Sequence, residues 1–148
     1  MKFSIVASIL SATSAFAAPA PEAETVSMMA ATPQWTIQSM RRNCNAANTE
    51  CNWLFGIKPG TGATKSISCP YVVKAKNAAT ANGGPFKCGD YTVTSGWSGQ
   101  FGAGKGFTTL SVVDNKKKLI VYPAYTDAEL AGGKIVTPNK SYAPQGLP

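Results

Sequence analysis

The chain contains no histidine, only seven acidic residues, and no hydrophobic run long enough to cross a membrane. Histidine is the commonest general acid and base of enzymes, so its absence removes the Ser-His-Asp and Cys-His arrangements and the fungal ribonuclease arrangement. The four cysteines show no CxxC spacing, which removes the usual zinc ligands as well. The sequence therefore predicts a non-enzymatic protein with no metal and no cofactor.

The few carboxylates after residue 34 are the remaining candidate catalytic groups. A glycosidase needs two carboxylates that face each other across a groove. Asp127 and Glu129 are better explained as part of a helix cap, which leaves Glu50 with Asp90 as a pair. A small hydrolase built on that pair is the enzymatic alternative.

The composition is basic, with fourteen lysine and arginine residues and a formal net charge of +7. Such a balance favours acidic partners, among them wall polyanions, anionic lipid and nucleic acid. The lysines are scattered apart from Lys116 to Lys118, and no basic stripe is interleaved with aromatic residues. Nucleic acid is therefore not a predicted partner, and most of the charge is interpreted as a solvated surface.

The N-terminus has the pattern of a secretory signal peptide. Lys2 is followed by a short apolar run and by the small-residue site Ala15-Phe16-Ala17, which predicts a signal peptide over residues 1–17. Residues 18–33 are rich in Ala, Pro and Glu and are predicted to be a flexible leader. Residues 34–148 are predicted to be a single secreted, extracellular β-domain without a membrane span.

Four cysteines in a small secreted domain indicate two disulfides, for which three connectivities exist. We favour Cys44 with Cys51, because that bond would close the asparagine-rich loop between them. We likewise favour Cys69 with Cys88, because that bond would staple the neighbouring hairpin.

The strongest β signal lies in residues 107–122. Two β-rich runs, 107–113 and 118–122, are joined by a polar turn and predict a hairpin at the centre of the core. Further strands are predicted over residues 35–40, 52–57, 66–76, 91–95 and 134–137. The expected fold is all-β, a small β-barrel or sandwich of six or seven strands with one short helical turn.

Local signals place several residues within this fold. The alternation in the first strand puts Trp35 and Ser39 on one face and Met40 on the other, and Trp35 and Trp53 are predicted to lie in the core. The helical turn is predicted by a capping box in Thr126-Asp127-Ala128-Glu129. Residues 77–85 are predicted to be a loop. The tail after residue 137 is predicted to be irregular, with Tyr142 packed against the strands.

The surface residues predicted to contact a partner are Trp97, Lys105, Lys116, Lys117 and Lys118. Trp97 is assigned to a glycine-rich loop, where an exposed indole could stack on a sugar ring. A protein that binds cell-wall carbohydrate or polyanion is accordingly the alternative function.

Asn139-Lys140-Ser141 is an N-glycosylation sequon in a chain predicted to be secreted. It follows Pro138, where exposure is expected. Asn139 is therefore a predicted glycosylation site.

Several segments, together with the signal peptide and the leader, carry a resemblance to known proteins. They are Trp35-Thr36-Ile37, Arg42-Asn43-Cys44, residues 51–57, residues 94–101 (TSGWSGQF) and residues 119–127 (LIVYPAYTD). They resemble the small secreted elicitor proteins of ascomycete fungi that induce the hypersensitive response, of the rice blast type, and more distantly the β-barrel allergen family of Alternaria. The resemblance implies a compact β-barrel with two disulfides, secreted into the apoplast, that acts on a plant component and triggers cell death and defence. It brings no catalytic motif.

Overall fold

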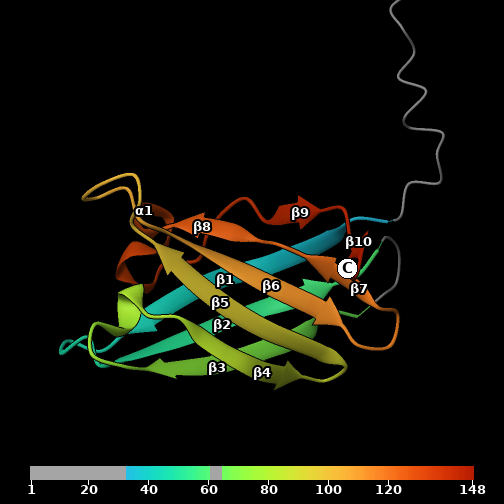
Figure 1. The fold of residues 1–148 in the computed structure, drawn as a ribbon, viewed down its shortest axis with the longest axis horizontal. Coiled ribbons are helices and arrows are strands. Elements are labelled where there is room, and N and C mark those ends of the chain that lie inside the picture. The colour runs from blue at the N-terminus through green and yellow to red at the C-terminus, as the bar shows by residue number, and fades with distance from the viewer. Residues whose placement is uncertain (1–32, 61–64) are drawn as a thin grey trace, which may run out of the picture. The chain divides into compact units, whose positions relative to one another are not determined.

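A computed structural model describes residues 33–60 and 65–148, and Figure 1 shows the path of the chain through them. The predicted signal peptide, residues 1–17, lies outside the described residues, and so does the predicted leader apart from Pro33. The described residues form two antiparallel sheets, a short α-helix and two 3-10 turns, and they carry two disulfides. These features confirm the predicted all-β class.

Four strands make up the smaller sheet, in the order β3-β2-β1-β9. Each strand is antiparallel to its neighbours. The strands are β1 (Trp35–Cys44), β2 (Glu50–Lys58), β3 (Ile67–Lys74) and β9 (Lys140–Tyr142). The predicted first hairpin is thus confirmed as β1 and β2, with the Cys44–Cys51 disulfide across its tip as predicted.

Six strands make up the larger sheet, five of them in the order β10-β7-β6-β5-β4. The strands are β4 (Gly83–Cys88), β5 (Tyr91–Ser98), β6 (Phe107–Asp114), β7 (Leu119–Val121), β8 (Ala124–Thr126) and β10 (Gln145–Gly146). The short helix α1 (Asp127–Leu130) follows β8, and the 3-10 turns are η2 (Ala78–Thr80) and η3 (Ala131–Gly133). β6 pairs with β5, β7 and β8, so the predicted β6–β7 hairpin does lie inside the sheet.

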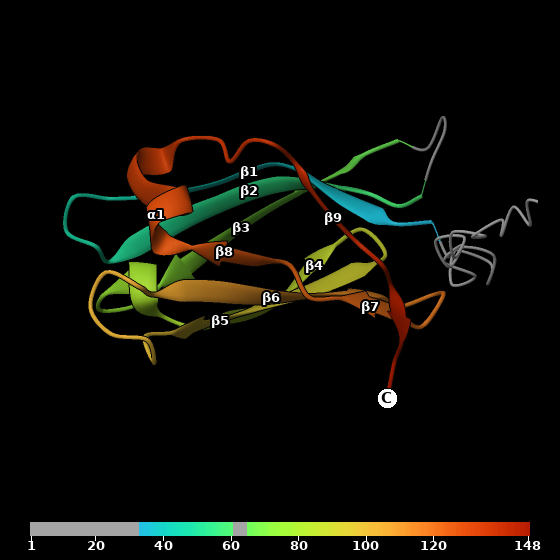
Figure 2. The ribbon, with the colours of Figure 1, turned by 90° about the horizontal axis from the view of Figure 1, so that it is seen from above.

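The two sheets form two layers that face each other, as the two views in Figures 1 and 2 show, and they enclose one hydrophobic core. Successive residues of a strand point to opposite faces, so alternate side chains enter this core. Trp35 and Trp53 are each 3% exposed, which confirms their predicted burial. Tyr71 of the small sheet stacks on Phe86 of the large sheet with ring centroids 4.5 Å apart. Aromatic contacts therefore join the two layers.

A β-bulge in β1 decides which of its side chains face the core. The register with β2 shifts where Ser39 takes a positive φ of 52°. Beyond the bulge Met40 and Arg42 are buried, while Arg41 is exposed. The prediction that Ser39 rather than Met40 shares the face of Trp35 is therefore wrong, because an inserted residue moves the later side chains to the other face.

Two connections join the edges of the sheets. On one side the disulfide between Cys69 of β3 and Cys88 of β4 links the edge strand of one sheet to that of the other. On the other side the C-terminal segment pairs with β1 as β9 and then with β7 as β10, which Figure 2 shows in red. The pairing of Cys69 with Cys88 is as predicted, but the bond joins two sheets instead of stapling one hairpin.

Three segments differ from the sequence-based prediction. β4 begins inside the segment expected to be a loop, and it pairs with β5. Residues 134–137 are not a strand, although Val136 donates its backbone N–H to the carbonyl of Met40 at 2.8 Å. The tail is not irregular, since it supplies β9 and β10, and Tyr142 packs against the core as predicted. These edge segments depend on distant partners, which local sequence patterns do not reveal.

Candidate functional site at the loop between β5 and β6

The predicted contact residues lie at two ends of β6. Trp97 lies near the end of β5, and Lys105 lies in the loop that leads into β6. Lys116 to Lys118 form the turn after β6, at its other end. Because β6 has eight residues, roughly 25 Å separates the two places. The structure therefore brings only Trp97 and Lys105 to the same end of the sheet.

Trp97 lies in β5, opposite Thr108 of β6, so its predicted place in the glycine-rich loop is wrong. Its half-buried indole donates from Nε1 to Asp127 Oδ2 at 2.9 Å, and its backbone N–H donates to Asn82 Oδ1 at 2.9 Å. A Cβ at Gly106 would lie 2.8 Å from the indole ring, so the chain passes Trp97 at a distance that only glycine allows. Trp97 thereby anchors the loop, and its role as a contact residue stays a prediction.

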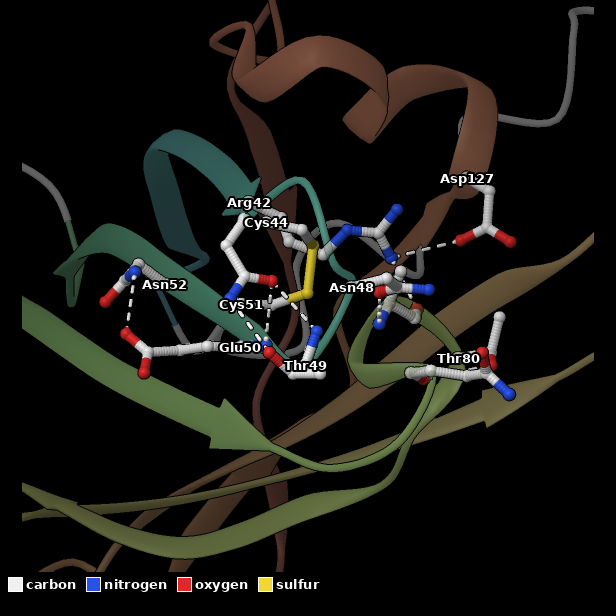
Figure 3. The surroundings of a disulfide bond; sticks show 12 residues. Arg42, Cys44, Asn48, Thr49, Glu50, Cys51, Asn52, Thr80 and Asp127 are labelled. Atoms are coloured by element: carbon white, nitrogen blue, oxygen red, sulfur yellow. Dashed lines mark hydrogen bonds and ion pairs between the residues drawn. A yellow bond between two sulfur atoms is a disulfide. The ribbon is translucent and has the colours of Figure 1, made fainter.

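Asp127 links Trp97 to Arg42, which is 7% exposed. Arg42 Nη1 donates to Asp127 Oδ1 at 3.2 Å and to the carbonyl of Ala79 at 2.8 Å. Figure 3 shows this ion pair beside the disulfide of the β1–β2 hairpin. The guanidinium also lies over the ring of Trp53, 5.6 Å from its centroid. This Arg42–Asp127–Trp97 network joins β1, β5 and α1 and fixes the position of the loop after β5.

The capping box predicted at the start of α1 is confirmed. Thr126 Oγ1 accepts the backbone N–H of Glu129 at 3.1 Å, and Glu129 Oε2 accepts that of Thr126 at 2.8 Å. Two backbone donors at the helix start are satisfied in this way. The cap holds Asp127 toward Arg42 and holds Glu129 beside Lys140, so one helical turn supplies both carboxylates of the site.

A surface hollow of about 330 Å³ opens beside the loop, and we call it the Phe101 hollow. Phe101 is 63% exposed and stacks on Phe107 with ring centroids 5.7 Å apart. Across from these rings, Lys140 Nζ contacts Glu129 Oε1 at 2.8 Å and lies 4.5 Å from the centroid of the Tyr125 ring. Lys105 also lines the hollow. An open aromatic face thus lies next to a charged pair that can donate and accept hydrogen bonds.

Sequence reasoning found Lys105 but missed the other charged and aromatic groups of the Phe101 hollow. One local signal was present, because Phe101 is the single aromatic residue of a glycine-rich loop and has no strand of its own to bury it. Lys140 and Glu129 gave no signal, since the tail must fold back before Lys140 can pair with Glu129 of α1 at the hollow.

The environment of Glu129 gives the hollow a titratable group. Partial burial by itself raises the pKa of Glu129, but hydrogen bonds from Lys140 and Thr126 outweigh burial and hold the pKa below its ordinary value. A lowered carboxylate pKa stabilises the folded state at pH values above the ordinary glutamate pKa. This contribution is lost as pH falls through the folded-state pKa.

We expect Glu129→Gln to unfold at lower urea concentration than the wild type at pH 7, because glutamine cannot form the ion pair with Lys140. The difference should shrink as pH falls below the ordinary glutamate pKa, and it should vanish once pH is below the lowered folded-state pKa. Urea unfolding across this range measures the effect. Glu50→Gln, which removes the 3.6 Å pair with Lys74, serves as the exposed control and should change little. A deficit for Glu129→Gln that stayed constant with pH would contradict the prediction.

The lysine turn between β6 and β7 is held by carboxylates. Asp114 Oδ1 accepts the backbone N–H groups of Lys116 and Lys117, each at 2.9 Å. Lys116 Nζ lies 3.0 Å from Asp90 Oδ2. Lys117 and Lys118 take part in none of the ion pairs found among the described residues. Two ammonium groups of the turn are therefore available to an acidic partner.

The alternative catalytic pair, Glu50 with Asp90, is not brought together. Glu50 opens β2 and pairs with Lys74 at the end of β3. Asp90 follows Gly89, where a Cβ would lie 3.7 Å from Ile67 at the start of β3. The eight residues of β3 place the two carboxylates roughly 23 Å apart, so this pair cannot face a substrate across one groove. Within residues 33–60 and 65–148, no cluster of three His, Cys, Asp or Glu side chains could hold a metal ion.

Asn139 is exposed just before β9, and its Oδ1 accepts the backbone N–H of Ser39 at 2.9 Å. The third sequon residue, Ser141, shares a 2.9 Å hydrogen bond with the hydroxyl of Thr36. The sequon therefore belongs to the segment that joins the two sheets. Its glycosylation remains a prediction.

The fold and the site define a class of protein, a small β-protein with two disulfides whose exposed functional groups gather on loops and sheet faces. The family model for Effector TSP1 matches residues 36–147, and the chain belongs to this family. The chain is also 56% identical over 145 residues to a protein of Hypocrea virens (strain Gv29-8 / FGSC 10586) described as Effector TSP1. The match covers 97% of this chain and 96% of that protein.

These comparisons support a family of fungal effectors. They do not support the narrower resemblance to the rice blast elicitors or to the Alternaria allergens. In the part of the chain that the structure describes, no helix is both long and apolar enough to cross a membrane.

Proposed function

We propose that this protein is a secreted, non-enzymatic effector that induces plant defence and hypersensitive cell death through its folded surface. The observation that carries the proposal is the match to an effector family over nearly the whole chain. The predicted signal peptide and the two disulfides are consistent with release into an oxidising extracellular space. The partner would be a component of the plant cell surface or apoplast.

We assign recognition to the Phe101 hollow. Among the large hydrophobic side chains of the described residues, Phe101 is the most exposed. Aromatic side chains supply much of the binding energy at protein interfaces. The Arg42–Asp127–Trp97 network fixes the base of the loop that carries Phe101, so less conformational entropy is lost when a partner binds.

Leaf infiltration tests the proposal, with the secreted protein purified from culture medium, where it is expected to begin at Ala18. The folded protein should cause cell death, and a heated, reduced sample should not. Phe101→Ser should need about a tenfold higher dose, as expected when an interface hot spot is truncated. Tyr122→Ser is the matched control, since Tyr122 is a 48% exposed aromatic residue outside the hollow.

Each outcome of the infiltration bears on a separate part of the proposal. No response to the folded wild type would overturn the elicitor function. Equal activity of Phe101→Ser and the wild type would agree with the elicitor function but would show that recognition does not use the Phe101 hollow. Full activity of the reduced sample would contradict recognition through the folded surface.

A second candidate function, binding of wall carbohydrate, is favoured by the exposed Phe101 and the half-buried Phe107 in the same hollow. The stacked rings of Phe101 and Phe107 offer an apolar face for a sugar ring, and the Glu129–Lys140 pair offers hydrogen bonds to its hydroxyl groups. Retention on chitin or glucan should then fall for Phe101→Ser. Retention on pectin should instead fall when Lys116 to Lys118 are changed to Gln, and it should weaken with salt. Lack of retention on all three polymers would exclude this function.

A further inference from the structure

The outer face of the small sheet carries a groove that shares no lining residue with the Phe101 hollow. The strand register puts Arg41, Leu54 and Pro70 in one row across β1, β2 and β3. Two hollows of about 420 and 390 Å³ flank this row, and Arg41 and Leu54 line both of them. We call the two hollows together the Arg41 groove.

Two local features of the sequence produce the Arg41 groove. The bulge at Ser39 turns Arg41 to the outer face and Arg42 to the core. Gly56 lies beside Ser68 on the neighbouring strand and leaves the floor of the second hollow without a side chain. A Cβ at Gly56 would collide with the hydroxyl of Ser66, which lines the same hollow, so a side chain at this position would have to displace Ser66.

The lining of the groove combines a single charge and aliphatic surface with five uncharged polar side chains, those of Ser39, Asn43, Asn52, Ser66 and Ser68. Arg41 is the one charged residue among the described residues that line either hollow, and it takes part in none of the ion pairs of the described chain. Val72 lines the first hollow and is 38% exposed, and Ile135 lines the second and is 48% exposed. The groove therefore presents a guanidinium that forms no ion pair within residues 33–60 and 65–148, between two open aliphatic surfaces.

This combination selects one chemical class of ligand. A polyanion would require several cations along the groove, and only Arg41 is present among its described lining residues. A neutral sugar would require an open aromatic face, but Trp53 and Tyr71 are only 3% and 4% exposed. A guanidinium binds a carboxylate with two parallel hydrogen bonds, and aliphatic side chains bury a hydrocarbon chain.

We propose that the Arg41 groove binds an amphipathic monocarboxylate, a ligand with one carboxylate and an aliphatic chain, such as a medium-chain fatty acid. The carboxylate pairs with Arg41, and the chain lies against Leu54 and one of the flanking aliphatic residues. The hollow volumes are in the range of small-molecule sites. This activity goes beyond the proposed effector function and depends on a different face of the protein.

Titration of the intact secreted protein with dodecanoate tests the proposal. Calorimetry measures the binding, and NMR of the methyl groups locates it. Saturable binding is expected below about 1 mM, with shifts at the methyl groups of Leu54, Val72 and Ile135. Dodecanol and dodecyltrimethylammonium carry the same chain with no charge or with the opposite charge, and both should bind more weakly.

Variants separate the groove from general surface charge. Arg41→Gln should weaken dodecanoate binding about tenfold or more, because a charge-assisted hydrogen-bonded pair is lost. Ile135→Ser should weaken it several-fold by removing aliphatic contact. Lys76→Gln, which removes an exposed lysine outside the groove, should change affinity by less than about twofold. Arg41 makes no ion pair in the described chain, so its variant is expected to fold, which the unchanged NMR spectrum of the core would verify.

Four results would overturn the proposal. They are the absence of saturable dodecanoate binding, equal affinity for dodecanol, full affinity in Arg41→Gln, and shifts confined to residues outside the groove. None of these results depends on leaf infiltration, so the ligand site and the effector function are tested separately.

Discussion

Replacing Cys69 and Cys88 together by alanine is expected to lower the free energy of unfolding by about 3 kcal/mol. The two residues are 19 positions apart, so the bond restricts a sizeable loop of the unfolded chain. In the folded state the bond joins β3 to β4, the edge strands of different sheets. Its loss therefore removes the covalent link on that side of the core.

The disulfide at the tip of the first hairpin provides a matched control. Cys44 and Cys51 are only 7 positions apart and belong to adjacent paired strands. Removing both should cost less, about 2.5 kcal/mol from loop closure alone. Urea unfolding without reductant measures both variants. Hydrogen exchange should accelerate at the β3 and β4 edges only in the Cys69/Cys88 variant. A larger loss of stability in the hairpin variant would contradict this account.

The strands of this fold were predictable wherever a local pattern decides the structure. β2 alternates Trp53, Phe55 and Ile57 inward, and all three are buried. The capping box at Thr126 was predictable for the same reason, because its partners lie three residues apart. β9 and β10 were not predictable, since each consists of two or three residues that become strands only by pairing with a distant strand.

The candidate site was harder to predict because its contacts are distant in sequence. Arg42 and Asp127 are 85 positions apart, and Trp97 and Asp127 are 30 positions apart. The bulge at Ser39 added a second difficulty, because it decides that Arg42 faces the core and Arg41 faces solvent. Two adjacent arginines look alike in the sequence, and one residue of register gives them opposite roles.

Breaking the Arg42–Asp127–Trp97 network is expected to destabilise the folded protein strongly. Asp127→Ala is expected to lower the free energy of unfolding by about 3 kcal/mol. Arg42 is 7% exposed and would keep only the carbonyl of Ala79 as a hydrogen-bond acceptor. Because the side chain of Asp127 is 29% exposed, water replaces part of the lost contact, and the effect should lie at the low end for a broken buried pair.

A double-mutant cycle separates the ion pair from the rest of the network. Arg42→Met keeps apolar contact with Trp53 without the charge, so the double variant Arg42→Met/Asp127→Ala should lose less than the sum of the two single variants, by about 1 kcal/mol or more. Strictly additive losses would mean that the two charges do not stabilise each other.

Asp127→Ala should also change the position of the loop at the Phe101 hollow, because the same carboxylate accepts the hydrogen bond of the Trp97 indole at 2.9 Å. Without it the indole loses its hydrogen bond, and the Trp97 fluorescence should shift to longer wavelength in the folded protein. If the loop after β5 is positioned through Trp97, this variant should need a higher dose in leaf infiltration although Phe101 and Lys105 are intact. Asp127→Asn, which can still accept the hydrogen bond from Trp97 but carries no charge, should lose stability and retain more of the activity. Equal activity of Asp127→Ala and Asp127→Asn would show that the loop keeps its position without the Trp97 contact.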